Sequence, residues 1–190
     1  MKKKSVIILC VVLGLIIIIA GAFISTKNSF VEKNENVENK LSAISTQLQR
    51  RADLIPNFVS SVKGYSDYEK STYTDVTNAR SAVNSASSVK EKQDAANQLD
   101  SAVSVWVNAV TEAYPDLKAN AQYIALMDEL AGTENRISTA RKDYNDATKE
   151  YNVAISRFPA SIVASVFGYT KADYFSADDS ASSVPQVSFD

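Results

Sequence analysis

The residue types that most often do chemistry in proteins are scarce in this chain. It has no histidine, and its single cysteine, Cys10, lies inside an apolar run. A Cys/His metal site is therefore excluded. Carboxylates, tyrosines, serines and lysines are abundant, so a carboxylate pair or a Ser-Lys dyad is the only catalytic chemistry the composition leaves open. The sequence contains no glycine-rich phosphate-binding loop. We therefore predict no catalytic, cofactor-binding or metal-binding residue and no enzyme activity.

Charged residues at two apolar-stripe positions could do something other than catalysis. Glu134 falls between Leu130 and Ile137 on a helical face, and Arg51 takes a stripe position where an apolar residue is expected. Arg51 can lay its stem on the core with its head in water, or form a buried ion pair. A buried Glu134 needs a partner, and a polar pair inside a bundle would define helix register. The candidates for this structural polar network are Arg51, Arg80, Glu134 and Arg136.

The first element of the chain is Val6 to Ile24, an uncharged apolar run that follows three lysines. As a helix it would reach about 28 Å, close to the ~30 Å hydrocarbon core of a bilayer. We expect a retained transmembrane anchor. A cleaved signal peptide is the alternative, because Ala20-Gly21-Ala22 can be read as a cleavage site. A lipoprotein signal is disfavoured, since Cys10 comes too early.

The lysines that flank the run predict its orientation. Lys2, Lys3 and Lys4 outweigh Lys27 and Lys33 on the other side. The positive-inside rule then places the N-terminus in the cytoplasm and the domain outside, in a single-pass plasma-membrane protein. A tail this short can also cross a membrane, so the opposite topology stays open.

Composition limits the class of the remaining chain. Five glycines and four prolines in 190 residues are too few for a sandwich or barrel and suit long helices. The net charge is −2, and without the three leading lysines it is about −5, which predicts no nucleic-acid binding.

Apolar residues at three- and four-residue spacing predict an all-α fold. We expect a transmembrane helix followed by an elongated antiparallel bundle of three to four long helices. Pro56 either starts a second helix at Leu54, capped by Asp53, or kinks one long helix. We expect the helix over 115–157 to continue through Gly132. The predicted helices are 30–55, 54–87, 89–114, 115–157 and 160–167, with a reversal at 84–88, and the predicted domains are an anchor (1–26), a bundle (27–175) and a flexible tail (176–190).

Several segments resemble one family in the right order: QRRADLIPNFVSSVKGYSDYE from Gln49, YPDLKAN from Tyr114, and TENRISTARKDYNDATKEY from Thr133. Together with Phe158-Pro159 and Tyr174-Phe175, they resemble the LemA family of bacterial membrane-anchored proteins. The resemblance implies a membrane segment and a helical bundle, and it brings no known enzyme activity, cofactor or catalytic residue. Tyr68 stands where many relatives have histidine.

These observations favour a membrane-tethered helical interaction or scaffold module. Its partners would be the lipid bilayer, through the N-terminal helix, and a protein of unknown identity. The alternative is a surface adhesin or antigen released by signal cleavage, and the remote alternative is a hydrolase with a carboxylate pair.

Overall fold

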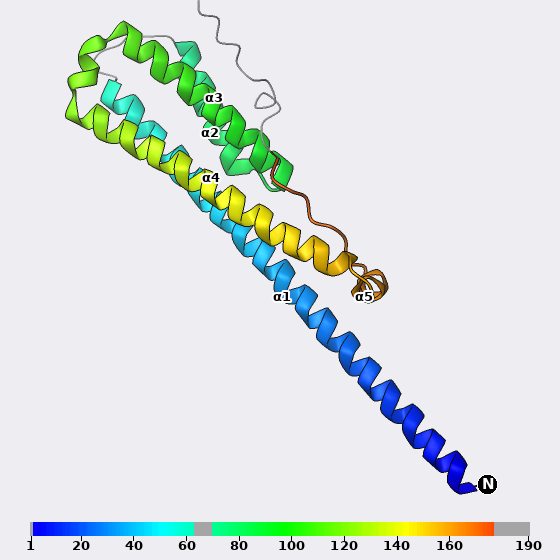
Figure 1. Ribbon diagram of the computed structural model, residues 1–190. Helices are drawn as coiled ribbons and strands as arrows, with labels where there is room; N and C mark the ends of the chain where they lie inside the picture. The colour runs from blue at the N-terminus through cyan, green and yellow to red at the C-terminus, as the bar shows by residue number, and fades with distance from the viewer. Residues whose placement is uncertain (1, 63–69, 177–190) are drawn as a thin grey trace, which may run out of the picture. The chain divides into compact units, whose positions relative to one another are not determined.

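The computed structural model describes residues 2–62 and 70–176, and within these ranges it is helical without any β-strand (Figure 1). The all-α fold class is therefore confirmed. The elements are α1 (Lys2–Val62), α2 (Lys70–Ser85), α3 (Val89–Ala113), the short 3-10 helix η1 (Pro115–Ala119), α4 (Ala121–Ser156) and α5 (Ala160–Phe167).

The chain divides into two compact units, and both α1 and α4 contribute to each of them. Unit 1 comprises Met1–Asn39 and Asp146–Asp173, and unit 2 comprises Lys40–Asn145 and Tyr174–Asp190. The boundaries expected between anchor, bundle and tail stay predictions, and residues 177–190 of the tail lie outside the described residues.

Unit 2 holds a core built from the second part of α1, from α2 and α3, and from the first part of α4. Phe58 packs edge-on against Trp106 at 4.5 Å between ring centroids and lies 5.7 Å from Tyr123. Each such side chain stabilises the fold by about 1.5–3 kcal/mol through burial. Trp106 is thus a core residue. It lies three residues after Val103 and four before Val110, so the three share one face of α3, as that spacing predicts. The buried residues clustered around Phe58 are Ala52, Ile55, Val76, Ala79, Leu99, Val103, Trp106, Val110, Tyr123 and Leu130.

Unit 1 is smaller and packs α5 with parts of α1 and α4. The Phe30 ring on α1 meets the Tyr169 ring edge-on at 5.3 Å. Lys33 on α1 pairs with Glu150 on α4 at 3.4 Å. The buried apolar side chains of this unit are Phe30, Val37, Ala147, Tyr151, Ile155, Val163 and Ala164.

Local capping explains why α3 begins where it does. The Ser88 hydroxyl accepts a hydrogen bond from the Glu91 amide at 3.2 Å, and the Glu91 carboxylate accepts one from the Ser88 amide at 3.1 Å. This capping box satisfies donors at the helix start that have no partner inside the helix. The reversal expected at residues 84–88 is confirmed, and α2 and α3 pack side by side (Figure 1).

The start of α4 differs from the prediction. The expected helix from Pro115 is the 3-10 helix η1, and α4 begins at Ala121. The reason is Asn120, whose side-chain oxygen accepts hydrogen bonds from the amides of Gln122 and Tyr123 at 2.9 and 3.1 Å. Asparagine is among the best residues for capping a helix start in this way. The expected continuity of α4 through Gly132 is confirmed.

The prediction of a new helix from Leu54 to Ser87 is wrong. α1 continues through Pro56 to Val62, which agrees with the single-helix alternative, and α2 begins at Lys70. An interior proline costs about 3 kcal/mol, but Pro56 is exposed while Ile55 and Phe58 are buried, and their packing offsets that cost. Tyr65 and Tyr68, which helical spacing predicts on the apolar face of the segment 54–87, lie outside the described residues.

The short helix α5 begins and ends as expected. It covers Ala160–Phe167 and is closed by Gly168, which has a φ of 73°. This left-handed conformation is open to glycine and strained for other residues, which explains the glycine at this position.

Candidate functional site

Arg51 is the most buried charged residue in the described part of unit 2. It is 6% exposed and lies on α1 between the core residues Leu48 and Ile55. A guanidinium at such a position needs carboxylate partners, because burying an unpaired charge costs several kcal/mol.

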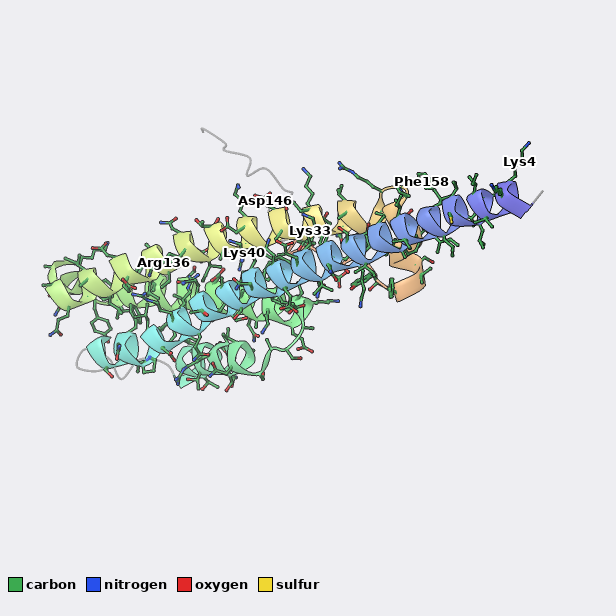
Figure 2. The ribbon with its side chains drawn as sticks, turned by 90° about the horizontal axis from the view of Figure 1, so that it is seen from below. Lys4, Lys33, Lys40, Arg136, Asp146 and Phe158 are labelled. Atoms are coloured by element: carbon green, nitrogen blue, oxygen red, sulfur yellow. The ribbon has the colours of Figure 1, made fainter. Side chains whose placement is uncertain are left out.

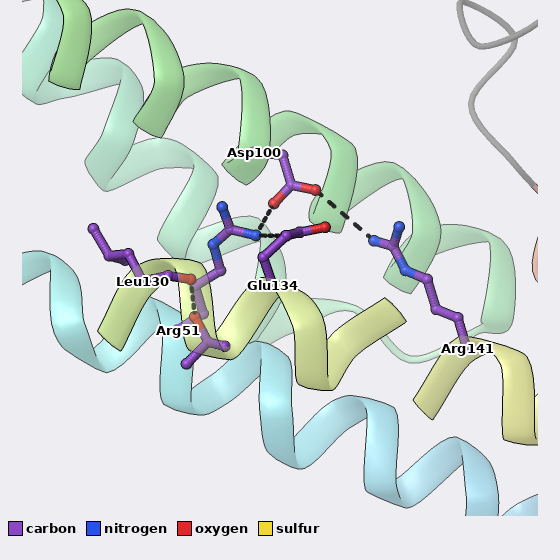
Figure 3. A network of polar contacts seen from close by, with 6 residues as sticks. Arg51, Asp100, Leu130, Glu134 and Arg141 are labelled. Atoms are coloured by element: carbon purple, nitrogen blue, oxygen red, sulfur yellow. Dashed lines mark hydrogen bonds and ion pairs between the residues drawn. The ribbon is translucent and has the colours of Figure 1, made fainter. Parts of the chain in front are cut away.

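Two carboxylates from two other helices supply this pairing (Figure 3). The Arg51 Nη1 atom lies 2.5 Å from Asp100 Oδ1 on α3, and it donates a hydrogen bond to Glu134 Oε2 on α4. One guanidinium therefore joins α1, α3 and α4 inside unit 2.

A second arginine extends the cluster. Arg141 on α4 has its Nη2 atom 4.0 Å from Asp100 Oδ2, and its guanidinium carbon lies 5.1 Å from the centre of the Phe175 ring. Two guanidinium groups thus face two carboxylates, and the set is close to neutral. We call Arg51, Asp100, Glu134 and Arg141 the ionic cluster.

Burial and charge act in opposite directions on Asp100. Loss of solvent raises the pKa of its carboxyl group from 3.8 to about 6, and the nearby Glu134 charge adds to the rise. Arg51 and Arg141 lower the pKa, but they do not cancel the effect of burial.

The structure brings together only two of the four residues predicted to form a polar network. Arg51 and Glu134 meet directly. Arg80 instead pairs with Asp53, with 3.7 Å between Nη2 and Oδ1. The Nη2 atom of Arg136 lies 2.8 Å from Glu129 Oε1. The Nη2 atom of Arg50 lies 2.8 Å from the same oxygen. The pairs made by Arg80 and Arg136 are thus separate from the ionic cluster.

The Arg136 guanidinium lies close to the glycine inside α4. A Cβ atom at Gly132 would lie 3.3 Å from Arg136 Nη1, closer than an ordinary contact. A side chain at position 132 would require the guanidinium to shift by a few tenths of an ångström.

Asp100 and Arg141 were missed, although their spacing carried a signal. Asp100 is four residues after Ala96 and three before Val103, and Arg141 is four after Ile137 and three before Tyr144. Residues at those separations share a helix face. Like Glu134, both are charged residues in phase with an apolar stripe.

The ionic cluster supports a structural role better than catalysis. Asp100 and Glu134 both pair with the same guanidinium, which links the helices that carry them. Two surface grooves in the described part of the chain are lined by other residues. Within residues 2–62 and 70–176, no group of three or more Asp, Glu, Cys or His side chains is placed to hold a metal ion.

Two asparagines on α4 hold the segment that follows α5. In unit 1, Asn152 donates to the Ala172 carbonyl and accepts from the Ala172 amide, both at 2.9 Å. In unit 2, Asn145 makes the same pair of bonds with Phe175, both at 2.8 Å. Each side-chain amide replaces a backbone partner for a segment without regular structure.

A sequence model described as the LemA family matches residues 40–189 of the chain. The chain belongs to the LemA family. The matched region takes in most of the LemA bundle and the whole ionic cluster, and it begins after the apolar N-terminal run.

Named relatives agree with this membership. Magnetosome protein MamQ 2 of Paramagnetospirillum magneticum (strain ATCC 700264 / AMB-1) is 27% identical to this LemA-family chain over 198 residues. The alignment covers 87% of this chain and 73% of the length of MamQ 2. Protein LemA of Metamycoplasma hominis (strain ATCC 23114 / DSM 25592 / NBRC 14850 / NCTC 10111 / PG21) is 25% identical over 158 residues, covering 83% of this chain and 72% of its own. Of these two relatives, only the first is named as a magnetosome protein, and that name describes the relative and not this chain.

Proposed function

We propose that this LemA-family chain is a membrane-tethered helical scaffold that presents its bundle to a protein partner outside the cytoplasm. The observation that carries the proposal is the continuity of α1. This one helix runs from Lys2 through the apolar run into the buried core around Phe58. The membrane segment and the first bundle helix are therefore one element.

The side chains of the apolar run support a lipid environment. Within the described residues, α1 is the one helix long and apolar enough to cross a membrane, and the apolar window that qualifies it is unburied. Exposed isoleucines, leucines and valines line the run on its sides. Leaving this surface in water costs about 25 cal/mol per Å², and a bilayer removes that cost.

Retention of the segment is favoured over release. The apolar run from Val6 to Ile24 is longer than the roughly 7–15-residue apolar core of a signal peptide. The three leading lysines support a cytoplasmic N-terminus, and with it an external bundle.

A groove on unit 2 is our candidate for the partner-binding surface. It has a volume of about 360 Å³ and is lined by residues of α2 and α3. Val105, an exposed apolar side chain, lies on its wall beside polar groups. The lining residues are Asp75, Asn78, Gln98, Ser101, Ala102 and Val105.

Membrane extraction and protease treatment test tethering and orientation together. The full-length chain is expected to stay in the pellet after an alkaline carbonate wash, and external protease is expected to degrade the bundle in intact cells or spheroplasts. The control is Ile16→Arg with Ile17→Arg, because each central arginine opposes insertion by about 2.5–3.5 kcal/mol. Release of the unaltered full-length chain by carbonate would overturn the tether, and mature protein in the medium beginning near Phe23 would favour the adhesin.

Crosslinking tests the partner. A photoreactive amino acid at Ser101, in the groove, is expected to give a reproducible protein adduct in intact cells, whereas one at the exposed Thr139 on α4 is not. Only monomer at both positions would remove the support for a scaffold role.

A further inference from the structure

The end of unit 1 that carries α5 exposes an apolar surface with no charged residue in the helix itself. Phe158 is 83% exposed and Val166 is 66% exposed, and Ile162 and Phe167 are exposed beside them. We call these four residues the α5 patch. Val163 and Ala164, on the other side of α5, are buried in the unit. Phe158 lies just before α5 and the other three residues of the patch lie on it. Exposed apolar side chains of this size, close together in the chain, indicate a binding surface.

The position of the α5 patch along α1 is given by one contact. The Lys27 ammonium lies 5.3 Å from the centre of the Phe167 ring. Lys27 is three residues after Ile24, the last residue of the apolar run, which is about 4.5 Å along a helix. The end of α5 therefore lies beside the level at which α1 would leave the hydrocarbon.

Phe158 agrees with this placement. Figure 2 shows Phe158 alongside α1, at a level between those of Lys4 and Lys33. Aromatic rings are favoured where acyl chains meet headgroups, and lysines near the ends of a span extend their ammonium groups toward water. Phe167 and Lys27 provide this combination near the end of the span, and Phe158 adds a second exposed aromatic ring in the same unit.

We propose that the α5 patch is a second lipid contact, which inserts at the boundary between acyl chains and headgroups beside the point where α1 leaves the membrane. The proposal rests on the tether proposed above. It makes α5 an interfacial helix that would hold unit 1 against the bilayer surface. The occupant is lipid, since the Phe167 ring lies against Lys27, three residues after the end of the membrane-spanning run.

Site-specific fluorescence on the full-length chain tests the α5 patch. In a Cys10→Ser background, Val166→Cys or Phe158→Cys is labelled with an environment-sensitive dye, and the chain is reconstituted into vesicles of phosphatidylcholine and phosphatidylglycerol. Both labels are expected to show blue-shifted emission and to lose intensity when lipids with a nitroxide near the headgroup are added.

The control label is Lys149→Cys, on an exposed face of α4 in the same unit. Its neighbour Glu150 pairs with Lys33, nine residues beyond Ile24, or about 13.5 Å along α1. This label is expected to keep a water-like emission and to resist quenching. Circular dichroism of each labelled variant checks that the helices are retained.

A label at the native Cys10 separates the two proposals. If Cys10 is quenched by deeply placed nitroxides while positions 158 and 166 stay water-like, the second lipid contact is wrong and the tether stands. Blue-shifted but unquenched labels at 158 and 166 also overturn it, because they show that protein covers the α5 patch. An unquenched Cys10 overturns the tether itself.

Discussion

The ionic cluster makes Arg51 the most consequential charged side chain in unit 2. Replacing it by methionine keeps most of its apolar stem but leaves Asp100 and Glu134 without their shared guanidinium. Removing one member of a buried ion pair costs 3–5 kcal/mol, and the partial exposure of the two carboxylates lowers our expectation for Arg51→Met to about 2–3 kcal/mol. Chemical denaturation of the variant measures this loss.

The adjacent Arg50 is a matched control. Its side chain is 57% exposed and pairs with Glu129 at the surface. Exposed ion pairs contribute about 0–1 kcal/mol, so Arg50→Met is expected to change stability little. Equal losses for the two variants would contradict the special role of the buried arginine, and an unchanged stability of Glu134→Gln would remove the proposed register-fixing pair.

Asp100 predicts a pH dependence of stability. Because burial raises its pKa from 3.8 to about 6, the folded chain holds a proton through this range that the unfolded chain has lost. The contribution of Asp100 to stability therefore falls as pH rises from about 4 to about 6, and Asp100→Asn should remove that slope. Denaturation midpoints across the window measure it. The exposed Asp94→Asn serves as control, and an unchanged slope in Asp100→Asn would show that the carboxyl titrates normally.

At the scale of elements, the capping box decides where α3 begins. Ser88→Ala is expected to destabilise the fold by about 1 kcal/mol, because the Glu91 amide loses its acceptor. The control is Ser104→Ala on the exposed middle of α3, where alanine is the better helix former. Thermal unfolding that ranked the two variants in the opposite order would contradict this role.

The same element has a second pH signature. Backbone and side-chain hydrogen bonds from Ser87 and Ser88 lower the pKa of Glu91 from 4.5 to about 2. The ionised Glu91 carboxylate therefore contributes fully to folding stability above pH 4.5, and this contribution is lost as pH falls toward 2. The direction is opposite to that expected for Asp100.

The asparagine contacts on α4 predict a local effect on amide exchange. Asn152→Ala removes the acceptor of the Ala172 amide, and Asn145→Ala removes that of the Phe175 amide. Each variant should accelerate hydrogen exchange at its own target amide and leave the other near its original rate. Because each variant is the control for the other, acceleration of both amides by either one would show a loss of structure beyond the single contact.

At the scale of the whole molecule, the apolar run and the bundle depend on different surroundings. The side chains of Val6 to Ile24 are mostly exposed and the qualifying window is unburied, whereas the core of unit 2 is closed by its own residues. Deleting residues 2–24 is therefore expected to remove the chain from the membrane pellet while leaving the thermal unfolding of the bundle nearly unchanged. A large fall in melting temperature would show that the run contributes to folding.

The sequence by itself determined the helical class, the apolar run, the reversal before α3 and the ends of α5. These features depend on local patterns: side-chain periodicity, capping residues and a glycine that can adopt a positive φ. The same patterns placed Trp106 in the core and carried α4 through Gly132.

Only the tertiary structure decided how the charged side chains pair and where two helices begin or end. Arg51, Asp100 and Glu134 come from three helices, so their meeting depends on packing that no local pattern encodes. Pro56 is a helix breaker by local rules, yet α1 continues because Ile55 and Phe58 are buried on either side of it. Long-range burial outweighs local preference at these places, since the free energy of packing a core side chain is comparable to the local cost.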